Sequence, residues 1–404
     1  MELVLRDTLT GTLRPVRRRP GRPIAMYVCG PTVYDVAHVG HGRTYLFFDV
    51  ARRFLEAEGL AVRHVMNLTD FEDKLDERAV KLGIPWRTLA RQEERAFFRD
   101  LKALGVQKPQ YHPRATEFVP QMIRAARRLE RTGRVHREGD EWIYTPPSRP
   151  ASANFPTDRE LAAHAVTEPG HPFPRSDGQA GAFMIWRLQD PPKPSWPSPW
   201  GRGVPGWHLE CYAMSEKFLG LPVDLHGGGV DLIFPHHYAE NEIALELQGT
   251  RFSRVFFHTA FVLLAGAKMS KSAGALVPLR TALEEVGRDG LRWYLLSVGP
   301  HRRLEWNLDA LHRAADEFTA VRAAIGHWLE PASPGRDSAA AARQLAEGVR
   351  RDLATDLATD RAFARLRSWA MRARRRRAGV RPSEVEAARE AIRTIEARTG
   401  LELL

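Results

Sequence analysis

The chain has 404 residues, of which 43% are hydrophobic and 27% are charged, a composition typical of a folded protein with two or three domains. It contains no run of about 18 apolar residues and no apolar N-terminal stretch, which argues against a membrane span and a signal peptide. With only two cysteines a disulfide framework is not expected, so we predict a cytoplasmic protein. The net charge of +11 suits a polyanionic partner such as RNA, although an arginine-rich composition would explain it equally well.

The N-terminal part of the chain predicts a βαβ unit. Residues 22–29 form an apolar run typical of a buried strand, and Gly30-Pro31-Thr32 ends it. Apolar residues then recur with helical spacing over 40–58, before a second strand at 62–68. A strand, a helix and a strand in close succession predict a parallel sheet.

The rest of the chain changes character twice. A helical pattern at 116–132 is followed by a stretch rich in Pro, Gly and Ser from 146 to 199, which we interpret as an inserted subdomain with extended loops. A strand at 223–226 and a helix at 235–248 resume the α/β pattern. Beyond residue 280 the pattern is mostly helical, with a linker at 330–338 and last helices at 339–374 and 383–398.

The two cysteines lie in segments that suit a metal site. Cys29 follows the first predicted strand, and Cys211 ends the segment Gly-Trp-His-Leu-Glu-Cys. A third segment, 234–240, adds two histidines and a carboxylate. Two thiols, a histidine and a carboxylate form a tetrahedral zinc set if these segments converge in the fold.

Two other segments suit phosphate. His38-Val39-Gly40-His41 stands at the start of the first long predicted helix, where free N–H groups and the helix dipole favour an anion. Lys268-Met269-Ser270-Lys271-Ser272 places two ammonium groups on a polar turn, where they would neutralise charge as pyrophosphate leaves. Each segment alone is common on protein surfaces, but the two together, in this order along the chain, indicate a site that binds the phosphates of a nucleotide.

These two segments resemble the HIGH and KMSKS signatures of class I aminoacyl-tRNA synthetases, and the chain more narrowly resembles the cysteinyl-tRNA synthetase family. The resemblance covers about residues 1 to 310 and is carried by the segments 26–35, 38–50, 67–74, 113–117, 197–220 and 226–237. It implies an α/β fold, in which a Rossmann-type nucleotide-binding domain carries an inserted subdomain and is followed by a C-terminal α-helical bundle.

The resemblance also implies a division of the chain into parts. These are the first half of the Rossmann catalytic domain (1–110), an inserted connective subdomain (111–195), the second catalytic half with the KMSKS loop (196–280), a stem-contact-like helical region (281–330) and a C-terminal helical domain (331–404).

In that family a zinc ion holds the substrate thiolate, so the resemblance implies one Zn²⁺ per chain, with Cys29, Cys211 and His236 as ligands. Zinc prefers sulfur to a hydroxyl oxygen, which would select cysteine over serine. The family usually reads HHENE, whereas this chain reads HHYAENE over 236–242. Glu240 keeps the i, i+4 spacing to His236 and is our fourth ligand, with Glu242 as the alternative.

The resemblance assigns the remaining site residues by position. It gives catalytic roles at the ATP phosphates to His38, His41, Lys268 and Lys271. Binding of ATP, with its Mg²⁺, or of the adenylate further involves Gly30, Thr32, Gly40, Thr44, Gly227, Gly228, Gly229 and Asp231. The cysteine-binding residues are Cys29, Thr69, Trp207, His226 and Asp231.

The implied reaction is activation of L-cysteine to cysteinyl-adenylate, followed by transfer to the acceptor stem of tRNA. Because the chain ends at Leu404, it leaves too few residues for the family's anticodon-reading domain, so a mycothiol-type ligase acting on glucosaminyl-inositol is the alternative. The segments 113–117 and 240–244 favour the tRNA ligase, and the basic run 372–377 does so unless it is a solvated helix face. A non-catalytic paralogue is disfavoured by the intact phosphate motifs. We expect a monomer that binds no membrane.

Overall fold

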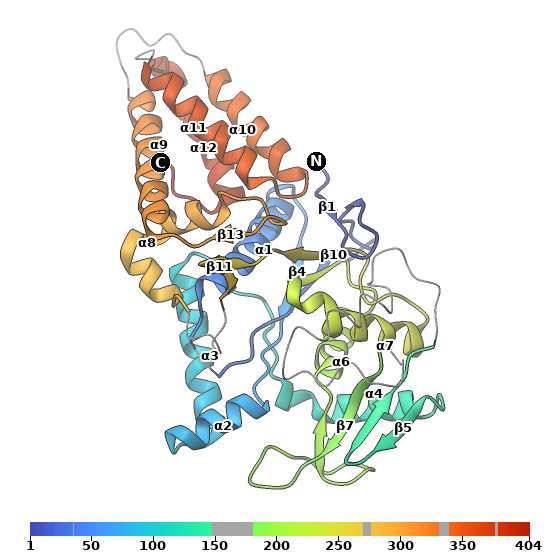
Figure 1. Cartoon of the computed structure of the whole chain (residues 1–404). Coiled ribbons are helices and arrows are strands. Elements are labelled where there is room, and N and C mark those ends of the chain that lie inside the picture. The colour runs from blue at the N-terminus through green and yellow to red at the C-terminus, as the bar shows by residue number, and fades with distance from the viewer. Residues whose placement is uncertain (35, 148–180, 270–275, 331–338, 376–378) are drawn as a thin grey trace.

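The structure, a computed structural model, describes residues 1–34, 36–147, 181–269, 276–330, 339–375 and 379–404. Figure 1 shows an elongated molecule with a parallel sheet at its centre, a second sheet at one end and a bundle of helices at the other. In the described ranges no helix is both long enough and apolar enough to cross a bilayer.

The central sheet has four parallel strands. β3 (Ile24–Val28) lies between β4 (Val62–Met66) and β9 (Leu225–Gly229), and β10 (Phe256–Thr259) pairs with the other side of β9. Every residue of β3 is buried because the sheet is covered on both faces. Helix α1 (Val39–Ala57) joins β3 to β4, which confirms the predicted βαβ unit. The carboxyl ends of these strands share one edge, where an active site is expected in such sheets.

A second, antiparallel sheet occupies the lower end of the molecule in Figure 1. It is built in order from β5 (Val135–Glu138), β6 (Glu141–Tyr144), β7 (Phe183–Leu188) and β8 (Gly203–Pro205). The sequence predicted extended loops over 146–199, so β7 corrects that prediction. Buried aromatic residues of β6 and β7 form part of a hydrophobic core. The sequence pattern did not indicate β7, because the surrounding stretch is rich in Pro and Gly.

The C-terminal part is a bundle of five helices in the described residues: α8 (Leu279–Leu296), α9 (Leu308–Leu329), α10 (Ala339–Ala354), α11 (Thr359–Arg375) and α12 (Val385–Thr399). The continuous helix predicted over 339–374 is wrong, because Asp356 and Leu357 adopt φ of 57° and 47° and separate α10 from α11. This turn is held from outside: the Asp356 backbone N–H donates to Val4, and its carboxylate accepts from the Arg6 backbone N–H.

The other elements pack around these three parts. The longer ones are the helices α2 (Asp73–Leu82), α3 (Trp86–Ala103), α4 (Val119–Glu130), α6 (His208–Phe218) and α7 (Tyr238–Gln248). The shorter ones are the strands β1 (Val4–Arg6), β2 (Leu13–Pro15), β11 (Val262–Leu264), β12 (Ala267–Lys268) and β13 (Leu304–Glu305), the 3-10 turns η1 (Ala115–Phe118), η2 (Val230–Leu232) and η5 (Pro382–Glu384), and the π turn η3 (Ile233–His237).

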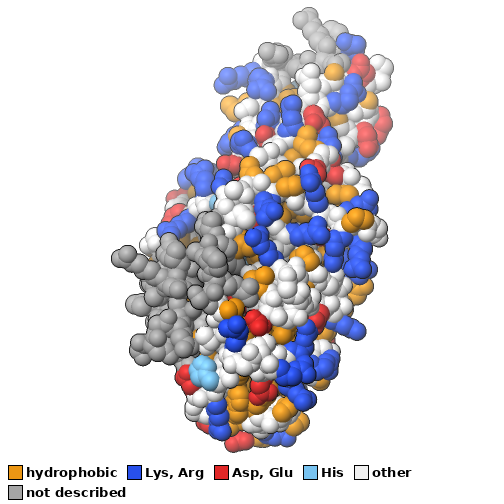
Figure 2. Space-filling model, turned by 90° about the vertical axis from the view of Figure 1, so that its right-hand side faces the viewer, with side chains coloured by type: hydrophobic (Ala, Val, Ile, Leu, Met, Phe, Trp, Pro, Cys, Tyr) orange, Lys and Arg blue, Asp and Glu red, His pale blue; other side chains and the backbone are white. Residues whose placement is uncertain are grey.

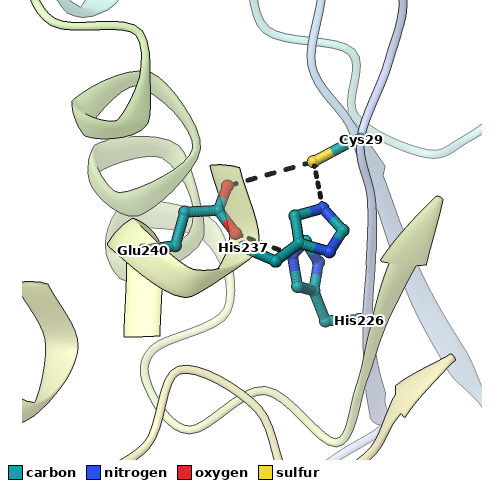
Figure 3. A group of neighbouring side chains, drawn as sticks. All are labelled: Cys29, His226, His237 and Glu240. Atoms are coloured by element: carbon teal, nitrogen blue, oxygen red, sulfur yellow. Dashed lines mark hydrogen bonds and ion pairs between the residues drawn. The ribbon is translucent and has the colours of Figure 1, made fainter. Parts of the chain in front are cut away.

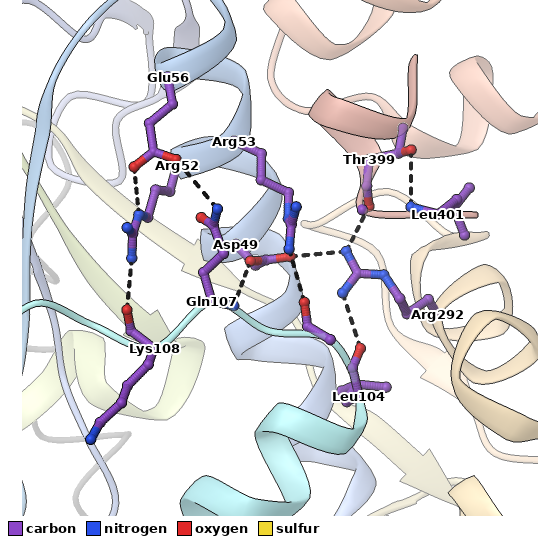
Figure 4. Close-up of polar contacts among 12 residues, drawn as sticks. Asp49, Arg52, Arg53, Glu56, Leu104, Gln107, Lys108, Arg292, Thr399 and Leu401 are labelled. Carbon is purple, nitrogen blue, oxygen red and sulfur yellow. Dashed lines mark hydrogen bonds and ion pairs between the residues drawn. The ribbon is translucent and has the colours of Figure 1, made fainter. Parts of the chain in front are cut away.

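Helix α1 is anchored by buried charges along its length. The Arg43 guanidinium, fully buried, donates to backbone carbonyls of Ala260, Phe261, Leu295, Val298, Gly299 and Arg302. Six residues further along the helix, the Asp49 carboxylate lies 2.9 Å from Arg292 on α8, in the network of Figure 4. The Arg43 contacts hold the N-terminal end of α1 against the segment that follows β10. Phosphate-binding residues are predicted in both, namely His38 and His41 at the helix start and Lys268 and Lys271 after β10.

Candidate metal and nucleotide site

Two cysteines, a histidine and a carboxylate from three distant segments meet at the carboxyl edge of the parallel sheet. The sulfur atoms of Cys29 and Cys211 lie 3.7 Å apart, and Cys211 Sγ lies 3.3 Å from Nε2 of His236. Glu240 Oε1 lies 3.0 Å from His236 Nε2 and 3.9 Å from Cys29 Sγ. All four side chains are buried, and their ligand atoms all lie within 4.8 Å of one another.

These distances fit a tetrahedral metal site. Zinc bonds of about 2.0–2.3 Å place neighbouring ligand atoms about 3.3–3.8 Å apart. The contacts among these four side chains range from 3.0 to 3.9 Å, close to that spacing. Two thiols with a histidine and a carboxylate are also a donor set that zinc accepts.

A second set of donors overlaps the first. Cys29 and Glu240 also face His226 and His237, as Figure 3 shows. His237 Nε2 lies 3.2 Å from Cys29 Sγ, and His226 Nε2 lies 2.8 Å from Glu240 Oε2. The two sets share a thiol and a carboxylate, and the first set has the additional sulfur that a thiophilic ion prefers.

The segment that carries the histidines is not a regular helix. His236 lies in the π turn η3, in which Phe234 has extended backbone angles, and α7 begins only at Tyr238. The predicted helix over 235–248 therefore begins three residues later than expected. The i, i+4 relation still brings His236 and Glu240 together, whereas Glu242, although buried, belongs to neither donor set of the described residues.

Burial and mutual interaction distribute charge in this cluster. Burial opposes ionisation of Cys29, but hydrogen bonding from Cys211 and the electrostatic interaction with His237 hold its pKa well below the usual range. Burial raises the pKa of Cys211 well above that range. Burial disfavours charge on His236 and Glu240 too, yet their attraction raises the histidine pKa to about 10 and lowers the carboxyl pKa to about 2. Because metal ligands must be deprotonated, metal uptake here would release protons.

Trp207 and His208 support His236 from its other side. The Trp207 ring stacks on the His236 ring at a centroid distance of 3.9 Å, and His208 Nδ1 lies 3.0 Å from His236 Nδ1. His208 stands three residues before Cys211 on α6, so one helix supplies both a candidate ligand and a partner of the candidate histidine ligand. The role of Trp207 as a wall of a cysteine pocket stays a prediction.

Thr69, predicted to bind cysteine, already has a partner in a buried acid. Its hydroxyl donates to Glu210 Oε2 at 2.7 Å, and both side chains are buried. Burial raises the pKa of Glu210 to about 8. Glu210 is therefore a candidate site residue that the sequence did not reveal, although it precedes Cys211 directly.

His226 and Asp231 occupy very different environments. Both ring nitrogens of His226 are engaged, one 3.0 Å from the Tyr27 carbonyl and the other near Glu240. The geometry thus favours a role of His226 in holding Glu240, and its contact with substrate stays a prediction. Asp231 lies exposed on η2, beside the end of β9.

The predicted phosphate-binding histidines cap helix α1. His38 is the N-cap residue, and its Nδ1 accepts from the backbone N–H groups of Gly40 and His41. The two histidine rings stack with a centroid distance of 3.8 Å. The helix N-terminus and both rings therefore lie together, but the N–H groups that were predicted to be free are occupied: that of Val39 donates to the Val277 carbonyl, and those of Gly40 and His41 donate to His38 Nδ1.

Other predicted nucleotide-binding residues surround this helix end. Thr44 Oγ1 lies 2.8 Å from Thr259 Oγ1 at the end of β10. Thr32 forms a β-bridge with Thr69, so the loop after β3 follows the end of β4. Lys268 belongs to β12, whereas Lys271 lies outside the described residues.

Two of the predicted glycines are required by the sheet itself. A Cβ on Gly30 would lie 1.6 Å from the Asn67 carbonyl oxygen, and one on Gly227 would lie 1.8 Å from that of Phe257. At Gly227 the neighbouring strand β10 thus accounts for the glycine without adenine. Roles of Gly228 and Gly229 at a nucleotide stay predictions.

The fold is that of tRNA synthetases. The structure resembles Mycobacterium tuberculosis methionyl-tRNA synthetase in complex with methionyl-adenylate, with a TM-score of 0.64, 18% identity and coverage of 95% of this chain and 89% of the other. It also resembles a putative arginyl-tRNA synthetase from Campylobacter jejuni, with a TM-score of 0.64, 12% identity and coverage of 95% and 94%. At these identities the likeness concerns the fold alone. Together with the sheet and helices described above, it defines a class I synthetase fold.

The sequence comparisons narrow this class. Residues 16–316 match the family described as tRNA synthetases class I (C) catalytic domain, and the chain belongs to this cysteinyl family. It is 38% identical to the cysteine--tRNA ligase of Aeropyrum pernix over 77% of this chain and 66% of that protein. The cysteine--tRNA ligase of Thermococcus onnurineus is 39% identical over 79% of this chain and 66% of that protein. The cysteine--tRNA ligase of Anaeromyxobacter dehalogenans is 37% identical over 84% of this chain and 74% of that protein. The chain thus spans 66% of the length of the first two relatives.

Proposed function

We propose that this chain uses ATP to convert L-cysteine into cysteinyl-adenylate and then transfers the cysteinyl group to tRNA in the cytoplasm. The observation that carries the proposal is the buried cluster of Cys29, Cys211, His236 and Glu240 at the carboxyl edge of the sheet. Relatives named cysteine--tRNA ligase at 37–39% identity support it.

The cluster provides a physical basis for choosing cysteine. A zinc ion held by these four side chains would supply a soft Lewis acid that prefers thiolate sulfur to the hydroxyl oxygen of serine. The protein's part is to hold the donors rigidly: they are buried, and the Trp207 ring is stacked on His236. Such a rigid first layer of ligands is what a selective site requires.

Activation itself would depend on charge neutralisation and positioning. The N-terminus of α1 would offer an anion the positive end of the helix dipole, together with the rings of His38 and His41. Lys268 and Lys271 would add positive charge as pyrophosphate leaves, with Mg²⁺ accompanying ATP. We expect no covalent enzyme intermediate, because positioning and electrostatics suffice for such a step.

The second substrate is proposed to be tRNA. Figure 2 shows one face of the molecule on which Lys and Arg side chains are more abundant than Asp and Glu. Arg372, Arg374 and Arg375 are exposed at the end of α11, and 376–377 of the same basic run lie outside the described residues. Exposed positive charge of this kind favours a phosphate backbone.

One assay tests both halves of the proposal. Purified protein is given labelled cysteine and ATP, with either tRNA or glucosaminyl-inositol as acceptor, and pyrophosphate exchange is followed beside acylation. We expect cysteine-dependent exchange, label on tRNA, and no activation of serine. Label on the sugar amine would replace tRNA as acceptor but leave cysteine activation standing. Absence of cysteine-dependent exchange in zinc-containing protein would overturn the proposal as a whole.

A further inference from the structure

A line of hydrogen-bonded side chains joins the N-terminal segment to the metal cluster. Thr8 Oγ1 lies 2.7 Å from His258 Nδ1, and His258 Nε2 lies 2.7 Å from His237 Nδ1. His237 Nε2 in turn lies 3.2 Å from Cys29 Sγ. Both histidine rings are buried, so their nitrogens bond to one another rather than to bulk water.

Thr8 is clamped in place beside the strand that carries His258. Its backbone N–H donates to the Phe256 carbonyl at 2.8 Å, and the Phe256 N–H donates to the Asp7 carboxylate at 2.9 Å. Phe256 begins β10, and His258 is the third residue of that strand. The hydroxyl of Thr8 is therefore held at a fixed distance from the His258 ring.

The chemistry at Cys29 sets the direction of every bond in this line. A neutral histidine ring has one N–H donor and one acceptor nitrogen. If one of its nitrogens donates a hydrogen bond, the other must accept, so the direction of one bond in the line determines the direction of the next. A metal-bound cysteine is a thiolate and can only accept, which requires the hydrogen of His237 on Nε2. His237 Nδ1 then accepts from the Nε2–H of His258, and His258 Nδ1 accepts from the Thr8 hydroxyl.

We propose that Thr8 is a positioning residue for the metal centre: its hydroxyl donates to His258 Nδ1 and so stabilises the tautomers of His258 and His237 in which His237 donates a hydrogen bond to the Cys29 thiolate. The inference rests on the proposed function, because it needs Cys29 as a metal ligand. A hydrogen bond to a ligand sulfur disperses its negative charge and leaves the metal a stronger acceptor for a further thiolate. Partners of metal ligands commonly tune a site in this way.

The orientation of the line also distinguishes the two donor sets. If His237 Nε2 itself were the ligand, its hydrogen would lie on Nδ1 and the whole line would run the other way. Thr8 would then accept a hydrogen bond from His258 Nδ1 instead of donating one. The tautomer of His258 in the zinc-loaded protein therefore reports which arrangement exists.

The test compares Thr8→Val, which removes the hydroxyl, with Thr8→Ser, which keeps it. Thr10→Val is the matched control, because Thr10 donates to Asp7 in the same turn but is not part of the line. Zinc affinity is measured by chelator competition, and the sulfur-to-metal absorption band is recorded after cobalt substitution. We expect Thr8→Val to weaken zinc binding at least about tenfold and to shift the cobalt band. Thr8→Ser and Thr10→Val should match the unmodified protein.

Equal zinc affinities and cobalt bands in all these proteins would overturn the inference, as would a zinc-loaded protein whose His258 carries its hydrogen on Nδ1 in nitrogen-15 NMR. The NMR measurement uses the unmodified protein, so it decides the question even if Thr8→Val does not fold. Failure of the proposed function has a different signature, namely a zinc-containing unmodified protein without cysteine-dependent pyrophosphate exchange.

Discussion

At the scale of single residues, the fourth ligand is the most specific question that the site raises. Two acids, Glu240 and Glu242, follow His236 on α7, and both side chains are buried. Only Glu240 reaches the donor cluster, where it contacts His236 and His226 through its two oxygens. Its carboxylate thus has one oxygen for the candidate metal and one for a histidine that holds it.

We predict that Glu240→Gln lowers zinc affinity by at least about a hundredfold, since loss of a ligand should exceed the 10–100-fold effect of losing a ligand's partner. Glu242→Gln, the same substitution two residues along the helix, should stay within about tenfold of the unmodified protein. Metal content after dialysis and chelator competition measure both, with circular dichroism as a control of folding. A larger loss for Glu242→Gln than for Glu240→Gln would assign the ligand to the other acid.

The sequence reached these candidate ligands because the resemblance to the cysteinyl family assigns Cys29, Cys211 and His236 by position, and the i, i+4 spacing adds Glu240. It could not reach their partners. His208, Glu210 and His258 become recognisable only when the fold places them against His236, Thr69 and His237. A buried polar side chain is normally hydrogen-bonded, but its residue type does not identify the partner, which can come from a distant part of the chain.

At the scale of elements, helix α1 links the predicted phosphate site to the C-terminal bundle. Its residue Asp49 and Arg292 of α8 are both inaccessible to solvent and lie 2.9 Å apart. Arg292 also donates to the carbonyls of Leu104 and Thr399, so α1, α3 and α12 meet at this ion pair (Figure 4). Burial opposes the charge of Asp49, but the arginines Arg292 and Arg53 outweigh it and lower its pKa.

We predict that Asp49→Asn destabilises the protein by about 3–5 kcal/mol, because it leaves Arg292 buried without its counter-charge. Glu56→Gln is the matched control on the same helix. Glu56 pairs with Arg52 at 2.8 Å, but it is partly exposed, and we expect a loss below about 1 kcal/mol. Urea unfolding measures both free energies. Similar losses for the two variants would show that burial does not govern the strength of these pairs.

Strand β4 carries a histidine that makes stability depend on pH. His64 is buried, and neither of its ring nitrogens has a hydrogen-bond partner. Burial, reinforced by the nearby charge of Arg52, lowers its pKa to about 3. The unfolded chain, with a histidine pKa of about 6.5, takes up a proton that the folded protein refuses, so His64 costs stability as pH falls below about 6.5.

We therefore predict that His64→Leu reduces the loss of stability on acidification. Between about pH 6.5 and 4.5, the unmodified protein should lose up to about 1.4 kcal/mol per pH unit more than the variant. Above about pH 7.5, where histidine is neutral in both states, the difference between the two proteins should be constant. Denaturant unfolding at a series of pH values measures this difference, and parallel curves across the acid range would refute the assignment.

The sequence predicted elements well where their own pattern determines them. The strands β3 and β4 and the helix α1 follow from local hydrophobic periodicity. The break between α10 and α11 does not, because Asp356 and Leu357 carry no glycine or proline signal and are held by β1. The π turn before α7 was equally out of reach, since it depends on how the histidine segment packs against β9 and α6.

At the scale of the whole molecule, two further clusters join distant parts of the chain. Glu58, at the end of α1, binds the N-terminal ammonium group together with Arg350 of α10 and Arg398 of α12. The other, the candidate metal cluster, joins the end of β3, the first turn of α6 and the segment leading into α7. A bound ion would therefore connect three segments that are far apart in sequence.

We predict that removing the metal destabilises the entire chain, because an ion that binds only the folded state adds to its stability. At a free zinc concentration about 100 times the dissociation constant, this contribution is about 2.7 kcal/mol. The unmodified protein should therefore unfold at a lower temperature after dialysis against a chelator and recover when zinc is restored. Cys211→Ser lacks one metal donor. It should unfold at a lower temperature than the zinc-loaded unmodified protein, and the chelator should not change that temperature. A chelator-induced shift of equal size in Cys211→Ser would place the stabilising ion outside this cluster.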